Sequence, residues 1–237
     1  MRSFGISFLL AVSTLSLSAC TPALQEKAAV AIVLDVSRST STWQYGLEQA
    51  TVNWTNGIMQ ETDGPNELDI SLFTMDAHAG SRNCIVSKQE ITGGDGQNDV
   101  TRDENRQRGI ELFQSSLQRF IKCEEAASVD IGTDLQMRNL KGFKRVLILT
   151  DGLLLNKANP KLNFGPAALD DLDSLKGQID VFLSESTTDL NGVKVEVYGL
   201  GFQANLSSNQ ATNLQDAWVY MFEESGATVI TVTSEMP

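Results

Sequence analysis

The chain has 237 residues, with 18 basic and 30 acidic side chains and a formal net charge of −12 at pH 7. A charge this negative disfavours binding to nucleic acid and electrostatic docking on anionic lipid. His78 is the only histidine and no Cys-x-x-Cys spacing occurs, which argues against a zinc site. The length suits one full α/β domain after a short amino-terminal segment.

The amino terminus has the composition of an export signal. A basic start, Met1–Ser3, precedes the apolar stretch Phe4–Leu17, which is too short for a comfortable membrane span. Leu17-Ser18-Ala19-Cys20 then resembles a bacterial lipobox. This resemblance implies a signal peptide at 1–19, a lipidated Cys20 with a tether at 20–27, and one domain at 28–237. The alternative is an ordinary secretory signal that happens to end in cysteine.

Apolar runs predict six strands along the domain. The unbroken run Ala28–Leu34 is typical of a strand buried on both faces of a parallel sheet. Further strands are expected at Leu68–Met75, Cys84–Ile91, Lys144–Thr150, Val193–Tyr198 and Thr228–Val232. We expect Cys84–Ile91 to be an antiparallel edge strand, because only a short turn-like segment precedes it. In Val193–Tyr198, the polar residues Lys194 and Glu196 indicate a wetter face.

Helical spacing of apolar residues predicts the intervening helices. They are expected over Trp43–Ile58, Ile110–Phe120, Asp134–Asn139, Leu169–Ile179 and Leu214–Met221. Strands alternating with helices indicate an α/β fold: a doubly wound, mostly parallel six-stranded sheet with one antiparallel edge strand and helices on both faces.

Two acidic segments each allow a bland and a metal-binding interpretation. Gly93–Asp99 is glycine-rich and acidic, but it lacks the ligand spacing of a calcium loop, so a plain loop is preferred. Asp170, Asp171 and Asp173 are better explained as the solvated first turn of a helix, where the helix dipole favours acids, than as a second metal site.

Two cysteines remain after Cys20. Export would place Cys84 and Cys123 in an oxidising compartment, so a disulfide between them is predicted. It would close a loop of about 40 residues, worth roughly 4 kcal/mol on the chain-entropy account. Two buried free thiols are the alternative.

The first strand is followed by oxygen-bearing side chains at alternate positions, Asp35, Ser37 and Ser39. Open α/β folds bind their ligands beyond the carboxyl ends of the strands. Carboxylates and hydroxyls are hard donors that suit Mg²⁺ or Mn²⁺. Each residue also has a simpler interpretation as a helix cap or turn residue.

The later motifs complete a pattern. Thr133 lies in an Asp-Ile-Gly-Thr-Asp segment, and Asp151 follows the run Val146–Leu149. With Asp35, Ser37 and Ser39 they resemble the von Willebrand factor type A (VWA) family and its metal-ion-dependent adhesion site, over roughly 28–237. The resemblance implies direct binding of the metal by Ser37 and Ser39, with Thr133 joining when the site is engaged. Asp35 and Asp151 would act mostly through water.

The resemblance implies a cell-envelope lipoprotein that binds a protein partner through Mg²⁺ or Mn²⁺, completed by an Asp or Glu of that partner. An envelope scaffold with a structural metal is the alternative. A phosphatase of the haloacid dehalogenase type comes third, because its motif needs Asp where this chain has Ser37. In a Gram-negative cell, Thr21 after the lipidated cysteine resembles an outer-membrane signal, which predicts a protein facing the periplasm or the surface.

Overall fold

The computed structural model describes residues 27–35, 44–60, 67–74, 87–92, 99–121, 140–154, 162–185, 188–202 and 204–236. Within these ranges the chain forms one six-stranded sheet in the order β3-β2-β1-β4-β5-β6. The strands are β1 (Ala28–Leu34), β2 (Glu67–Thr74), β3 (Ser87–Thr92), β4 (Arg145–Leu149), β5 (Lys194–Tyr198) and β6 (Thr228–Thr233). The predicted α/β class is confirmed.

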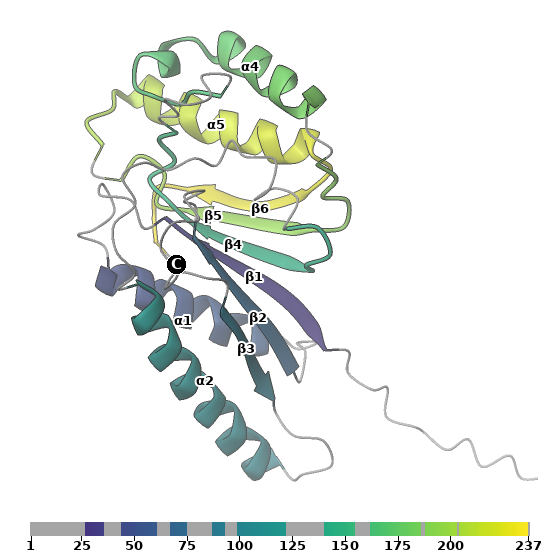
Figure 1. Ribbon diagram of the computed structural model, residues 1–237. Helices are drawn as coiled ribbons and strands as arrows, with labels where there is room; N and C mark the ends of the chain where they lie inside the picture. Colours follow the sequence, from purple (N-terminus) through teal and green to yellow (C-terminus); the bar gives the residue numbers. More distant parts are fainter. Residues whose placement is uncertain are drawn as a thin grey trace, which may run out of the picture.

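The directions of the strands bring the carboxyl ends of the parallel strands to one edge of the sheet. β1 pairs in parallel with β2 and with β4, and parallel pairing continues from β4 to β5 and from β5 to β6. β3 pairs with β2 in the antiparallel sense. Figure 1 shows the arrowheads of β1, β4 and β6 at the left of the sheet. The segments that leave these strands therefore meet at one edge, as in other open α/β sheets.

Helices cover both faces of the sheet (Figure 1). One face carries α1 and α2, and the other carries η2, α4 and α5. Their bounds are α1 Gln44–Gln60, α2 Asp99–Ile121, η2 Ala168–Asp170, α4 Leu172–Glu185 and α5 Ser208–Glu224.

Each face of the sheet contributes to its own apolar layer, because successive side chains of a strand point to opposite faces. Val30, Ile32 and Leu34 of β1 belong to the layer beneath α1. Ala31 and Val33 belong to the layer beneath α5. The predicted core face of α1 is confirmed, since its apolar residues are buried: Leu47, Ala50, Trp54 and Ile58.

The predicted start of the second helix is wrong. α2 spans 23 residues from Asp99, whereas apolar spacing predicted a start at Ile110. In the first turns, exposure is high: Val100 and Glu104 are exposed and Arg106 is half-buried. The half-buried face of this segment is made of polar residues and glycine, including Thr101, Asn105 and Gly109, so it leaves no apolar period in the sequence.

The helix predicted over Leu169–Ile179 is interrupted. Leu169 lies in the short helix η2, and α4 begins at Leu172. The break occurs at Asp171, whose carboxylate oxygen Oδ1 accepts a hydrogen bond from the backbone N–H of Ser174 at 3.1 Å. That bond caps the amino terminus of α4. Asp171 thus has the helix-start role that was preferred over metal binding.

The wetter face predicted for β5 is wrong at Glu196, which is 5% exposed. Its Oε1 lies 2.8 Å from Nη2 of Arg145 on β4. Its Oε2 accepts a hydrogen bond from the Tyr198 hydroxyl at 3.1 Å. The Arg145 guanidinium also lies 5.9 Å from the ring centroid of Trp54 on α1. These partners allow the Glu196 carboxylate to be buried, although the alternation along β5 predicts that it faces solvent.

The outer strand β6 carries an irregularity. Val195 pairs with Val229, but the next residue, Glu196, pairs with Thr231. Ile230 is therefore an extra residue in β6, and it is 48% exposed. One inserted residue of this kind is a β-bulge, which bends the strand and increases its local twist.

Several predictions lie outside the described residues. They are the signal peptide, Cys20 and its tether, the pair Cys84 and Cys123, the loop 93–98 and the helix at 134–139. In the part of the chain that the structure describes, no helix combines the length and apolar character needed to cross a membrane.

Candidate metal centre at the carboxyl edge of the sheet

Two of the five predicted metal-site residues lie in the described part of the chain, and both follow neighbouring strands. In the β1–β4 pairing, Leu34 is opposite Leu149. The backbone N–H of Asp35 donates to the carbonyl of Leu149 at 2.9 Å, so the ladder extends past the strand ends. Asp35 therefore lies beside Thr150, and Asp151 is one residue further along. Asp35 and Asp151 therefore lie at the same edge of the sheet.

Thr150 connects the two strand ends. Its hydroxyl Oγ1 donates a hydrogen bond to Oδ2 of Asp35 at 2.9 Å. The same oxygen accepts a hydrogen bond from the backbone N–H of Gly152 at 2.9 Å. One hydroxyl thus orients the Asp35 carboxylate and shapes the turn after β4. In the sequence pattern Thr150 only ends the fourth predicted strand.

Asp151 is held by the backbone around it. Its Oδ1 accepts a hydrogen bond from the N–H of Leu153 at 2.9 Å. Its carbonyl oxygen accepts one from the N–H of Gly201, in the segment after β5, at 2.8 Å. A carboxylate that accepts its own backbone two residues on is a frequent turn device. Here the turn also ties the loop after β4 to the loop after β5.

Gly152 is required by both conformation and space. Its φ is 73°, a left-handed value that favours glycine. A Cβ added there would overlap Cδ2 of Leu200 and lie 2.9 Å from Nε1 of Trp218. The Trp218 indole donates to the Gly152 carbonyl at 3.2 Å. The turn that presents Asp151 is therefore packed directly against the core.

Both carboxylates are withdrawn from water: Asp35 is 1% exposed and Asp151 is 4% exposed. Burying ionised carboxylates costs free energy unless hydrogen bonds or positive charge compensate. The described hydrogen bonds supply part of that compensation. A divalent cation that prefers oxygen ligands would add positive charge there, and two carboxylates with the Thr150 hydroxyl at Asp35 are chemically suited to Mg²⁺ or Mn²⁺. The residues therefore fit such an ion.

The remaining predicted ligands, Ser37, Ser39 and Thr133, lie outside the described residues. Among the described residues, no group of three or more His, Cys, Asp or Glu side chains is placed to hold a metal. The described part of the candidate site consists of Asp35, Thr150 and Asp151, with Gly152 and Gly201 shaping its backbone.

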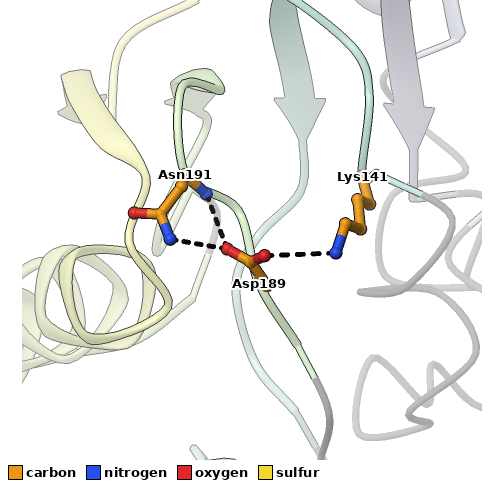
Figure 2. Close-up of polar contacts among 3 residues, drawn as sticks. All are labelled: Lys141, Asp189 and Asn191. Atoms are coloured by element: carbon orange, nitrogen blue, oxygen red, sulfur yellow. Dashed lines mark hydrogen bonds and ion pairs between the residues drawn. The ribbon is translucent and has the colours of Figure 1, made fainter.

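A second polar cluster lies at the opposite edge of the sheet, before β4 and β5. Figure 2 shows Asp189 between Lys141 and Asn191. Its carboxylate accepts bonds from Lys141 Nζ at 3.1 Å and from Asn191 Nδ2 at 2.7 Å and N at 3.2 Å. The bond from Lys141, followed by those from Asn191, lowers the pKa of Asp189. Lys141 and Asp189 are both exposed, so this is a surface cluster. We call Lys141, Asp189 and Asn191 the Asp189 clasp.

Comparisons with known proteins find similar chains only among solved structures, and at low identity. No protein-family model matches the chain, and no curated protein matches it. Among solved structures, the chain is similar to the pilus adhesin SpaC from Lactobacillus rhamnosus GG in its open conformation, with 9% identity and a TM-score of 0.44 over 86% of this chain and 28% of that one. It is also similar to proximal thread matrix protein 1 from the mussel byssus, with 17% identity and a TM-score of 0.37 over 89% and 42%. The chain thus spans less than half the length of either protein.

Proposed function

We propose that this chain is a lipid-anchored protein of the bacterial cell envelope whose VWA-like domain binds a protein partner through Mg²⁺ or Mn²⁺. The observation that carries the proposal is that two buried aspartates, Asp35 and Asp151, follow the ends of neighbouring parallel strands at one edge of the sheet. In this arrangement Asp35, Ser37, Ser39, Thr133 and Asp151 hold the ion. When bound, the ion supplies a positive charge that accepts a carboxylate oxygen from the partner.

The choice of ligands explains why a partner is needed. Neutral hydroxyls in direct contact leave most of the charge of a divalent ion uncompensated, so an outside carboxylate is attracted. Aspartates one step removed hold the hydroxyls and the bound water in place. The bond from Thr150 to Asp35 is an interaction of this orienting kind. Asp35 and Asp151 are therefore positioning residues in the proposal, and the hydroxyls are the direct ligands.

The first prediction tests the ion. The full chain, purified in detergent, binds Mg²⁺ or Mn²⁺ in titration calorimetry, and Asp151→Ala weakens this binding at least tenfold. Loss of a buried carboxylate removes both charge and orientation from the site, and altered orienting groups typically cost 10–100-fold in metal affinity. Asp173→Ala on α4, which changes an exposed acid away from the site, serves as the matched control and retains wild-type affinity.

Absence of binding of either ion to chain that is folded by circular dichroism would contradict the proposal. A partner test follows the same logic. Asp35→Ala abolishes capture of the envelope partner in the presence of Mg²⁺, and EDTA abolishes capture by the wild type. If capture survives both changes, the partner binds another face of the domain, and the alternative of an envelope scaffold with a structural metal is favoured.

A further inference from the structure

The segment after β5 forms a tight turn at the edge that carries the candidate metal centre. The N–H of Phe202 donates to the carbonyl of Gly199 at 3.0 Å. Gly199 and Gly201 have φ values of 90° and 70°, which glycine adopts at little cost. Two such residues within four positions define a turn with a fixed shape.

Two contacts hold this turn against the candidate site, one through Gly201 and one through Leu200. Gly201 donates to the carbonyl of Asp151 at 2.8 Å. Leu200 is 2% exposed, and its Cδ2 is the atom nearest to the position of a Cβ on Gly152. The turn thus points Leu200 into the core and places Phe202 one residue beyond the bond to Asp151. Since consecutive Cα atoms are 3.8 Å apart, Phe202 lies within roughly 10 Å of the Asp151 backbone.

Phe202 is 44% exposed in this fixed position. Single exposed apolar residues are common on protein surfaces. Phe202 differs in that its turn is built on two glycines and bonded to a residue of the candidate centre. A half-exposed aromatic side chain on a fixed backbone turn has only two side-chain torsions to order, so it can bury further apolar area without a large loss of conformational entropy.

Because the chain is negatively charged, an apolar contact at Phe202 would help it to bind a carboxylate-bearing partner. An acidic partner approaches a protein with a formal net charge of −12. Beyond about 8 Å salt screens this repulsion, but at contact distance it opposes binding. A contact with the ion alone must overcome that repulsion. An apolar contact beside the ion adds affinity that is independent of charge.

We propose that Phe202 is a specificity-determining residue that contacts an apolar side chain adjacent to the partner's metal-binding Asp or Glu. The inference rests on the function proposed above and refines it. The partner segment carries an acidic residue with Leu, Ile, Met or Phe within two positions. Burying the exposed part of the Phe202 ring contributes about tenfold to affinity.

Selection from a random heptapeptide phage library tests the inference. The library is panned in Mg²⁺ against immobilised full chain, either wild type, Phe202→Ser or Val181→Ser, and the bound phage are eluted with EDTA. Val181 is the matched control because it lies on α4 and is 51% exposed. Wild type and Val181→Ser enrich Asp or Glu with an apolar neighbour. Phe202→Ser retains the acidic preference, loses about tenfold of the apolar preference and binds Mg²⁺ with wild-type affinity in calorimetry.

The outcomes separate the two proposals. Acidic residues enriched without apolar neighbours, or an apolar preference unchanged in Phe202→Ser, overturn the role of Phe202 and leave the proposed function standing. Absence of any Mg²⁺-dependent acidic enrichment in the wild type overturns the proposed function, and the role of Phe202 with it.

Discussion

At the scale of single residues, Thr150 determines how the Asp35 carboxylate is presented. Its hydroxyl bonds both to Asp35 and to the backbone of Gly152, and Thr150 itself is 1% exposed. A buried donor or acceptor left without a partner costs about 1–3 kcal/mol. One side chain therefore supports two groups whose partners water cannot easily replace.

Thr150→Val tests this directly. Valine keeps the shape of the side chain but offers neither a donor to Asp35 nor an acceptor to Gly152. We expect the free energy of unfolding in urea to fall by about 2–4 kcal/mol, from a lost bond to the charged Asp35 (about 1.5–3 kcal/mol) and a lost neutral bond to Gly152 (about 0.5–1.5 kcal/mol). Thr150→Ser keeps the hydroxyl and loses only a methyl group, so it loses about 1 kcal/mol. Equal stability of the two variants would show that neither hydrogen bond matters.

The sequence predicted some of these residues and missed others for a physical reason. Asp35 and Asp151 each follow an apolar run, so strand ends alone bring them to one edge. The role of Thr150 depends on which residue of β4 lies beside Asp35, 115 positions away. Such register is set by pairing in three dimensions. Gly201 and Phe202 belong to a turn whose significance comes only from its bond to Asp151.

At the scale of elements, the buried cluster of Arg145, Glu196 and Tyr198 joins β4 to β5 beneath α1. Alternation along β5 predicted solvent on the Glu196 side, because a carboxylate in a strand is usually exposed. The prediction failed because Arg145 on the next strand pairs with the carboxylate, and Arg145 in turn lies over the ring of Trp54 on α1. A single-strand pattern carries no information about a partner on another strand.

Glu196→Ala should destabilise the protein strongly, because removing one member of a buried pair leaves the other charge poorly compensated. We expect a loss of about 2–4 kcal/mol in urea unfolding, at or below the usual range because Arg145 keeps some contact with solvent. Lys194→Ala, an exposed change on the same strand, stays within about 0.5 kcal/mol. A loss no larger than that of the control would refute the role of the cluster.

Tyr198 gives that variant a second readout. Burial raises the pKa of Tyr198, and the negative charge and hydrogen bond of Glu196 raise it further. In Glu196→Ala the absorbance titration of this tyrosine should therefore move to lower pH. A group whose pKa is raised in the folded state loses its contribution to stability as pH rises above its unfolded value of 10.0. The cluster thus also predicts weakening of the fold in alkali.

The helices show where apolar periodicity is informative. It located α1, α5 and the second half of α2, which bury a face against the sheet. It missed the start of α2 at Asp99 and joined η2 to α4 across the cap at Asp171. Caps and exposed turns are set by polar side chains, whose signals are local and easily mistaken for a continuous charged surface.

At the scale of the whole molecule, the clasp at Asp189 links the segments that precede β4 and β5 (Figure 2). Hydrogen bonding from Lys141 and then from Asn191 lowers the folded-state pKa of Asp189 below its ordinary 3.8. The unfolded chain therefore takes up this proton first as pH falls. The stabilisation is complete above the unfolded pKa and is lost as pH falls through the folded pKa.

Asp189→Asn removes this acid dependence, because an amide has no proton to gain. Stability measured between about pH 2 and pH 6 should decline less steeply in the variant than in the wild type. Glu104→Gln, a change of an exposed acid on α2, leaves the slope unchanged. Parallel curves for wild type and Asp189→Asn would remove the clasp from the acid response.

The anchor and the candidate centre lie at opposite ends of β1 under the proposed function. β1 begins at Ala28, next to the expected tether, and Asp35 follows its far end. Seven strand residues rise roughly 23 Å at 3.3 Å per residue. A short tether at 20–27 would hold the Asp189 edge toward the bilayer and present Asp35, Asp151 and Phe202 to the periplasm or the outside.

The bulge at Ile230 also affects how this protein coexists with its own copies. β6 reads Thr-Val-Ile-Thr-Val-Thr, with neither charge nor proline, and it forms the rim of the sheet. An unbroken strand of that composition is a template on which identical chains add side by side into fibres. The extra residue breaks the regular spacing of donors and acceptors midway along the rim. The rim therefore lacks an unbroken ladder of backbone groups on which a second copy of the chain could add a strand.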